Sequence, residues 1–459
     1  MKHFTFLSES TTRFIMLWLG LSFCYVAQAA DSATPLTLLD AYQLAQQHDA
    51  QIASAVAARD AGREKLPQGR AGLLPQVSLE ADYNNYNVDT TYNRLTPGLS
   101  STENDYRYDS TSYSVSLTQP LFRLQNLAVY RQAQSQVSIA EDTFVIAEQN
   151  LILRVADAYF NVLIAEESLV AAQSQTSATS RSLEEATAKF EVGTVTKTDV
   201  DEAQAGYDLA RANEIVTLNE LQVNKQTLTK IIGQTPNKLR GASELVVTPL
   251  QPENMAQWEQ TALANSPVIR VAQNQLAVAQ QEVARNRGER YPTVDLVASY
   301  TDSSLDGQDL TGAGYDSDTA MIGVQLQIPI YRGGSLSSSM REATANRIKS
   351  QQDLRESREQ VKLDTRQAYL TVTSGRLQVQ AYQQAVKSSE SALMTTQRGY
   401  EVGLRTSLDV LNSQQQLFEN RRNLSNAKYN YLNSLLQLKA AVGMLAVSDV
   451  EDINRLLTK

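Results

Sequence analysis

The sequence has 459 residues and a formal net charge of −9, and it contains one cysteine and two histidines. So few thiols and imidazoles argue against cysteine nucleophiles, disulfide frameworks and cysteine-ligated metal centres. The acidic balance also argues against a basic nucleic-acid-binding surface. We therefore expect no enzymatic activity, no cofactor, no metal site and no nucleic-acid partner.

The N-terminal residues are typical of a secretory signal. Lys2 and Arg13 supply positive charge, residues 14–26 are mostly apolar, and Ala27-Gln28-Ala29 is a small-residue cleavage site. The apolar stretch is shorter than the roughly 20 residues of a membrane-spanning helix. We expect residues 1–29 to be removed as a signal peptide, together with the only cysteine, Cys24. No later apolar run is long enough to predict a transmembrane helix.

The chain contains an internal duplication. Residues 190–200 recur at 400–410 with six of eleven positions identical, at an offset of 210. Two further matches, 74–79 with 291–296 and 115–123 with 324–332, have offsets of 217 and 209. Because these two offsets differ, the polar segment between the two matched stretches has a different length in each repeat. Loops tolerate such a change in length. The chain after the signal therefore divides into a first repeat (30–240), a connector (241–254), a second repeat (255–445) and a C-terminal segment (446–459).

Both repeats have the same expected plan. A first helical stretch (37–70, then 255–290) precedes a β-hairpin (73–123, then 291–332), a long helix, a glycine turn and a shorter returning helix. Prolines are absent between Pro120 and Pro236 and after Pro329, which favours long uninterrupted helices. Each long helix, over 123–193 and 333–403, would extend roughly 100 Å.

The first long helix carries apolar residues at alternating spacings of four and three. This heptad pattern, with one stutter, is typical of a coiled coil, and its many alanines permit close helix approach. The pattern alone fits a helical bundle or a fibrous rod equally well. The expected seam consists of Ala133, Val137, Ala140, Phe144, Ala147, Leu151, Val155, Ala158, Val162, Ala165, Leu169 and Ala172.

Apolar and polar residues alternate in the expected strands, over 77–83 and 322–330 for example. One apolar face and strands of roughly 9–11 residues are typical of a membrane β-barrel. A soluble hairpin packed on a helix is the alternative. The polar segments 84–111 and 301–319 are expected to be loops.

Four strands are too few to enclose water, and an open sheet edge in lipid leaves backbone groups without partners. Three chains together would supply twelve strands. The alternation therefore predicts that closure of the sheet requires oligomerisation.

Several motifs resemble those of the TolC family of outer-membrane efflux and type I secretion channels, over essentially the whole chain after the signal. They are the turns Val192-Gly193 and Val402-Gly403, the junctions Gln119-Pro120-Leu121-Phe122 and Ile328-Pro329-Ile330-Tyr331-Arg332-Gly333-Gly334, and the segment Ala427–Leu432. The resemblance implies a mixed α and β membrane protein: a homotrimer with a twelve-stranded outer-membrane β-barrel continuous with a long periplasmic coiled-coil α-barrel. Residues 234–253 and the C-terminal segment would form a belt around the helices.

The resemblance also implies a function and partners. The function is that of an exit duct, in the outer membrane with a large periplasmic portion, that passively conducts small molecules or proteins in a tripartite efflux pump or a type I secretion system. The partners are two further copies of the chain, outer-membrane lipid, a periplasmic adaptor (membrane fusion) protein and, through it, an inner-membrane pump of RND, ABC or MFS type. A secreted trimeric coiled-coil structural protein or adhesin is the alternative. The sequence does not name the cargo.

The resemblance places a periplasmic gate at the two glycine turns. Asp199, Tyr400 and Arg405 match links that hold the gate closed, and Asp409 matches a carboxylate ring in the constriction. A second ring carboxylate of the family is replaced here by Asn412, which implies weaker binding of polyvalent cations. For both aspartates, capping of a helix after a turn is the alternative role.

The same turns are the implied contacts of the adaptor. The positions concerned are Val192, Gly193, Val402 and Gly403. Because glycine adopts a positive φ at little cost, a purely structural turn is the alternative at each tip, and both roles are compatible.

Overall fold

The computed structural model describes residues 35–92, 102–242, 247, 249–307 and 313–457. The expected signal peptide (1–29) lies outside the described residues, as does part of the connector (241–254). Within the described ranges, no helix combines the length and the apolar composition that crossing a bilayer requires.

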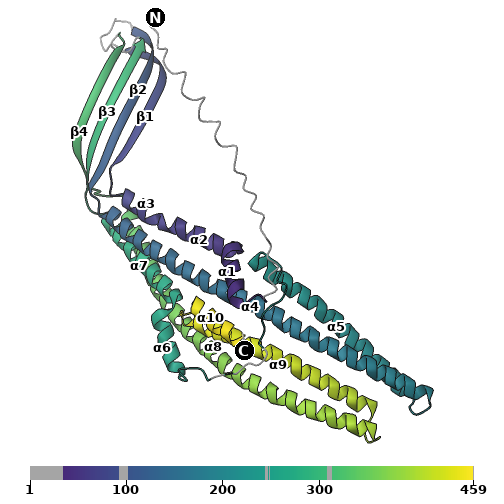
Figure 1. The fold of residues 1–459 in the computed structure, drawn as a ribbon. Helices are drawn as coiled ribbons and strands as arrows, with labels where there is room; N and C mark the ends of the chain where they lie inside the picture. Colours follow the sequence, from purple (N-terminus) through teal and green to yellow (C-terminus); the bar gives the residue numbers. More distant parts are fainter. Residues whose placement is uncertain (1–34, 93–101, 243–246, 248, 308–312, 458–459) are drawn as a thin grey trace, which may run out of the picture. The chain divides into compact units, whose positions relative to one another are not determined.

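The two repeats contain matching elements. The first has α1 (Leu38–His48), α2 (Ala50–Arg63), α3 (Lys65–Ala71), β1 (Gln76–Tyr92), β2 (Thr102–Phe122), α4 (Leu124–Glu191) and α5 (Lys197–Ile232). The second has α6 (Met255–Asn265), α7 (Pro267–Gly288), β3 (Thr293–Gly307), β4 (Tyr315–Gln327), α8 (Ser335–Glu401) and α9 (Ser407–Ala441), and α10 (Val447–Leu456) follows. Figure 1 shows the long helices α4 and α8, each beside its returning helix, α5 and α9.

Capping residues divide the first helical stretch of each repeat. The Asp49 carboxylate accepts hydrogen bonds from the backbone N–H groups of Gln51 (2.8 Å) and Ile52 (2.9 Å), and it thereby starts α2. Pro267 occupies the first turn of α7, where its fixed φ suits a helix start and its missing N–H leaves no bond unmade. The stretches 37–70 and 255–290 are therefore short consecutive helices.

The four strands form one antiparallel sheet in the order β1-β2-β3-β4. Successive side chains along a strand point to opposite faces. The expected alternation is confirmed, because one row across the sheet is apolar and the next is mostly polar. The apolar row consists of Val77, Leu117, Ala298 and Ile322, and the next row begins with Ser78, Ser116 and Ser299.

The apolar face of the sheet is uncovered. Val77, Leu79 and Ile322 expose 67%, 74% and 76% of their surfaces. Among the described residues, β1 and β4 each pair on one side only. An exposed apolar face with two free edges is a surface that requires a further partner.

The strands are longer than expected, and the prediction of loops over 84–111 and 301–319 is wrong for most of these residues. β1 and β2 have 17 and 21 residues, and β3 and β4 have 15 and 13. Cross-strand pairs support the first hairpin beyond its apolar part: Tyr86 stacks on Tyr108 with ring centroids 4.8 Å apart, and the Asn85 amide donates to Asp109 at 2.6 Å. Polar composition alone therefore does not predict where these strands end.

The heptad seam of α4 lies in the interior, as predicted. Every seam residue is at least half-buried. Small residues bring neighbouring helices close: a Cβ at Gly62 or Gly69 would collide with Ala140 or Ala133 of α4. The fully buried members of the seam are Ala133, Leu151, Val155, Ala158, Val162, Ala165 and Ala172.

The middle of α4 is also buried on a second side, where the residues before α1, the end of the first repeat and the C-terminal segment pack. The Tyr159 hydroxyl lies 2.9 Å from the Leu36 carbonyl oxygen and accepts a hydrogen bond from the Arg240 N–H at 3.0 Å. Phe160 stacks on Tyr429 of α9 with ring centroids 5.8 Å apart. Apolar residues of the C-terminal segment, Val450, Ile453 and Leu457, join the same core. Burial raises the pKa of Tyr159 above its ordinary value of 10.0.

Candidate gate at the helix tips

The two tips are turns of the same geometry. Gly193 has φ 78° after α4, and Gly403 has φ 76° after α8. The Thr194 N–H donates to the Lys189 carbonyl at 2.9 Å, and the Leu404 N–H donates to the Gly399 carbonyl at 2.8 Å, which closes the end of each helix. A Cβ built on either tip glycine meets nothing within 4 Å. The glycines are therefore required by backbone conformation and not by lack of space.

Asp199 and Asp409 complete capping boxes at the starts of α5 and α9. The Asp199 carboxylate accepts from the Thr196 N–H at 2.8 Å and from its hydroxyl at 2.7 Å. The Asp409 carboxylate accepts from the Thr406 N–H at 2.9 Å and from its hydroxyl at 3.0 Å. Each threonine hydroxyl in turn accepts from the aspartate N–H. Within one chain, helix capping therefore occupies one oxygen of each carboxylate and leaves the other oxygen free of the capping box.

These hydrogen bonds also shift the titration of the two carboxylates. The hydroxyl and then the N–H of Thr196 lower the pKa of Asp199 from its ordinary 3.8. The N–H and then the hydroxyl of Thr406, with a smaller contribution from the charge of Arg405, lower the pKa of Asp409 in the same way. Both side chains therefore carry a negative charge at neutral pH.

Tyr400 joins the two repeats through Lys189, a residue that the sequence did not single out. The Lys189 ammonium donates to the Tyr400 hydroxyl at 3.3 Å and lies 4.5 Å from the centroid of its ring. The same ammonium pairs with Glu185 at 2.6 Å, and this carboxylate is the main cause that raises the pKa of Lys189. The second repeat gives no hint that Lys189 is important, because the residue that corresponds to Lys189 there is Gly399.

The other expected gate residues lie at the tip without such links. Tyr400 and Asp199 do not hydrogen-bond each other in the described chain. The charge of Arg405 acts on Asp409, and its Cγ would lie 2.8 Å from a Cβ at Gly399. Asn412 is exposed one turn after Asp409 on α9.

The turns present exposed apolar side chains. Val192, Val402 and Leu404 expose 74%, 69% and 81% of their surfaces. Three largely exposed aliphatic side chains form a surface suited to contact with another protein.

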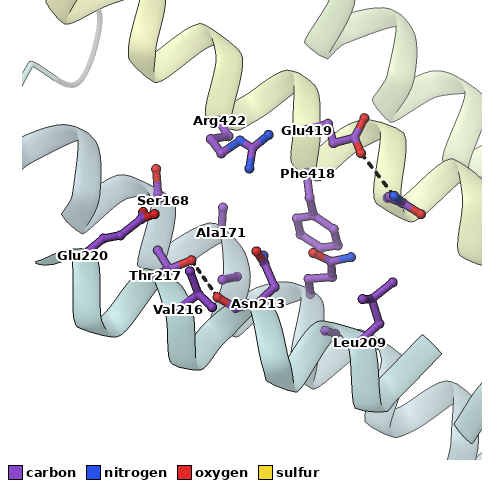
Figure 2. A pocket seen from close by; sticks show the side chains of 14 residues that line it. Ser168, Ala171, Leu209, Asn213, Val216, Thr217, Glu220, Phe418, Glu419 and Arg422 are labelled. Carbon is purple, nitrogen blue, oxygen red and sulfur yellow. Dashed lines mark hydrogen bonds between the residues drawn. The ribbon is translucent and has the colours of Figure 1, made fainter. Parts of the chain in front are cut away.

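Further from the tips, α4, α5 and α9 line an open groove of about 260 Å³ (Figure 2). Phe418 extends from α9 into the groove toward α5, and Arg422 of α9 lines the same groove. Within α5 the Thr217 hydroxyl donates to the Asn213 carbonyl at 2.8 Å. No group of three or more histidine, cysteine or acidic side chains in the described part of the chain could hold a metal ion. The remaining labelled lining residues are Ser168, Ala171, Leu209, Val216, Glu220 and Glu419.

Comparison with solved structures identifies the class of the fold. The outer membrane protein VceC of Vibrio cholerae matches with a TM-score of 0.73 and 21% identity, over 88% of this chain and 96% of VceC. The Campylobacter jejuni CmeC outer membrane channel matches with a TM-score of 0.75 and 17% identity, over 92% and 89%. The fold is that of the outer-membrane channels.

Sequence comparison identifies the family. The model of the outer membrane efflux protein family matches residues 41–234 and 258–444, and the chain therefore belongs to this family. It is 30% identical over 449 residues to the alkaline protease secretion protein AprF of Pseudomonas aeruginosa. This match covers 96% of this chain and 91% of AprF. It is 32% identical over 456 residues to the outer membrane protein TolC of Escherichia coli. This match covers 97% of this chain and 89% of TolC.

The resemblance to the TolC family is confirmed, and with it the general function. The chain is an outer-membrane exit duct of the kind used in efflux and type I secretion, with a large periplasmic portion. Its family is a family of transport channels and not of enzymes.

Proposed function

We propose that three copies of the chain form the working duct, with their sheets closed into one twelve-stranded barrel in the outer membrane. The observation that supports this is the uncovered apolar face of a sheet with two unpaired edges. In lipid the apolar face is favourable, but each unpaired backbone group costs several kcal/mol. Pairing β4 of one subunit with β1 of the next removes both edges.

The tips form the gate and the contact with the adaptor. Val192 and Val402, exposed beside Gly193 and Gly403, receive apolar side chains of a periplasmic adaptor. The adaptor connects the duct to an inner-membrane pump of RND, ABC or MFS type. Opening separates α4 from α8 at the tip and therefore breaks the contact between Lys189 and Tyr400.

Asp409 gives the constriction its charge. Three copies of a carboxylate with one oxygen free of the capping box place negative potential around the threefold axis, which favours cations. Asn412 supplies no second ring, so polyvalent cations bind more weakly than they would to two rings. Arg405, whose charge acts on Asp409 within the chain, is also available to a neighbouring subunit.

The cargo that the comparisons favour is protein delivered by an ABC-type exporter. AprF and the proteases secretion protein PrtF of Dickeya chrysanthemi match 96% and 91% of this chain at 30% and 31% identity. The solvent efflux pump outer membrane protein SrpC of Pseudomonas putida matches 76% at 27%. Small-molecule efflux is the second candidate, and drug sensitivity of a deletion strain with normal protein secretion would favour it.

Fractionation tests the assembly. The protein is expected in the outer membrane, and on an unheated denaturing gel it should migrate as a trimer that heating converts to monomer. Recovery as a soluble monomer would remove the basis for a closed barrel. A trimer in the soluble fraction would support the adhesin or structural-protein alternative.

A further inference from the structure

The face of the sheet opposite the apolar row of Val77 changes in character along the strands. Near the helices this face carries mostly short hydroxyl side chains, in rows that run across the strands. The rows include Ser78, Ser116 and Ser299, then Ser114, Thr301 and Thr319, then Ser112, Ser303 and Ser317. Hydroxyl groups donate and accept hydrogen bonds, so this part of the face is well hydrated.

Farther along the strands, the same face becomes aromatic. Tyr86 of β1 lies opposite Tyr108 of β2, and their rings stack with centroids 4.8 Å apart and an interplanar angle of 25°. Leu305 lies opposite Tyr315 in the row before this pair, and Tyr106 lies in the row after it. The name aromatic collar is used for Tyr86, Tyr106, Tyr108, Leu305 and Tyr315.

Cross-strand packing accounts for only part of the collar. A stacked tyrosine pair stabilises a hairpin by itself. Tyr86 nevertheless exposes 40% of its surface, and Tyr315 on the edge strand β4 exposes 55%. The rings therefore present apolar surface to whatever occupies the space in front of this face.

A glycine on β3 leaves one side of Tyr108 without a cross-strand side chain. Gly307 is the partner of Tyr108 in the register between β2 and β3. A Cβ at Gly307 would lie 2.5 Å from the Arg107 carbonyl oxygen, and its φ of 113° is a conformation that other residues rarely adopt. The backbone at this row thus excludes a covering side chain from β3.

The proposed barrel places the collar inside the duct. Val77 and Tyr86 are separated by an odd number of positions, so their side chains lie on opposite faces of β1. In the proposed trimer the apolar row contacts lipid, and the collar therefore faces the lumen. Because the helices form the periplasmic portion, the collar lies toward the outer end of the barrel, beyond the hydroxyl rows.

We propose that the aromatic collar binds the aromatic side chains of an exported polypeptide as it leaves the barrel. This rests on the proposed trimer and on protein as its cargo. Stacking on a tyrosine requires no particular cargo sequence, because every planar ring presents a π face. A contact of this kind suits a duct, which conducts only if its cargo can enter a site and leave it again. The hydroxyl rows offer a passing chain no comparable apolar surface.

Peptide binding tests the collar. The purified trimer in lipid nanodiscs is dialysed against a neutral hexapeptide with two tryptophans among glycine and serine, or against the same peptide with alanine in place of both tryptophans. The wild type should bind the tryptophan peptide and not the alanine peptide. Tyr86→Ser combined with Tyr108→Ser should weaken binding about tenfold, since each lost ring stack costs about a factor of three in affinity.

Tyr83→Ser is the matched control. Tyr83 is on the same strand and exposes 68% of its surface, but it lies on the face of Val77. Its replacement should leave the affinity at the wild-type value. Tyr86→Phe combined with Tyr108→Phe keeps both rings and should also bind as the wild type does, which separates stacking from hydrogen bonding by the hydroxyls.

The outcomes separate this inference from the proposed trimer. In a protein that is trimeric before heating, absence of peptide binding, or equal binding by the wild type and the double serine variant, overturns the collar and leaves the trimer standing. An equal loss in Tyr83→Ser also overturns it, because the peptide would then bind on the lipid-facing side. A wild type that is monomeric before heating overturns the proposed function itself.

Two further measurements complete the test. N-acetyltryptophanamide carries one ring without a chain, and the hexapeptide should bind about threefold more tightly because it supplies two rings. Equal affinity for the two probes overturns a polypeptide as the occupant. Tyr315→Ser covers the case in which the double serine variant does not assemble: it should weaken peptide binding about threefold, and unchanged affinity contradicts the collar.

Discussion

Lys189 holds the tip of α4 against Tyr400 of α8 by two contacts, a hydrogen bond and a cation–π interaction. Each contributes about 0.5–1 kcal/mol at an exposed site. Lys189→Met removes both, whereas Tyr400→Phe removes only the hydrogen bond. We therefore expect the closed-state conductance in planar bilayers to rise in both variants and to rise more in Lys189→Met.

Lys197→Met is the matched control for this prediction. Lys197 also lies beside a tip, but its ion pair within the described ranges is with Asp201 on its own helix, at 2.7 Å. Its removal should leave conductance at the wild-type value. A closed-state conductance of Lys189→Met equal to that of Lys197→Met would contradict a role for the Lys189–Tyr400 contact in closing the duct.

The capping role of Asp409 and the ring role proposed for it can be separated by substitution. Asparagine still offers a side-chain oxygen to the Thr406 N–H and hydroxyl, so Asp409→Asn should keep the start of α9 while it removes the charge. Asp409→Ala removes both. We expect both variants to lose cation preference, measured as the reversal potential in a salt gradient. Only Asp409→Ala should lower the thermal stability of the trimer.

The depressed pKa of Asp409 sets the sign of its pH dependence. A carboxyl with a lowered pKa contributes fully above its ordinary value of 3.8, and the contribution is lost as pH falls below that value. Cation preference should therefore persist between about pH 5 and about pH 8.

Asp201→Asn, which removes a charge of the same sign near the other tip, should leave the preference intact. Unchanged selectivity in Asp409→Asn would leave capping as the role of this residue.

At the scale of elements, the repeat predicts how strands of neighbouring subunits pair. Within the chain, Thr118 of β2 lies opposite Val297 of β3. Adding the offset of 209 to Thr118 gives Gln327 of β4, and subtracting the offset of 217 from Val297 gives Glu80 of β1. The repeat therefore predicts that Gln327 lies opposite the partner subunit's Glu80. This register keeps the apolar rows on one face, whereas a slip of one residue would reverse every side chain.

Cysteines on the polar face test this register. Gln327→Cys with Glu80→Cys should form a disulfide between subunits in the outer membrane. Gln327→Cys with Asn84→Cys should not, because Asn84 lies four residues, about 13 Å, further along the same face of β1. A stronger crosslink to position 84 than to position 80 would contradict the register.

The elements differ in how far the sequence predicts them. The proline-free helices, the seam from Ala133 to Ala172 and the alternating strands follow from local periodicity, which one chain segment carries by itself. The continuation of β1 to Tyr92 does not, because polar residues such as Asn85 extend a strand only when a partner such as Asp109 lies opposite. The same limit applies to Lys189, whose contact with Tyr400 depends on how the repeats pack.

At the scale of the whole molecule, the internal duplication explains why one chain supplies two different junctions. Within the chain, α4 meets α9 through Glu167, Ser425 and Tyr429, while α8 and α5 keep apolar faces uncovered. The sheet likewise pairs β2 with β3 internally and leaves β1 and β4 with one partner each in the described chain. In the proposed trimer, β4 pairs with β1 of one neighbouring subunit and β1 pairs with β4 of the other.

Single-channel recording of the purified trimer in planar bilayers tests the central claim most directly. The duct is predicted to show a low-conductance, cation-preferring closed state, since in the proposed gate the tips are held together and Asp409 supplies the charge of the constriction. A correctly assembled outer-membrane trimer that conducts no ions, with the wild-type tip and with Lys189→Met alike, would contradict it.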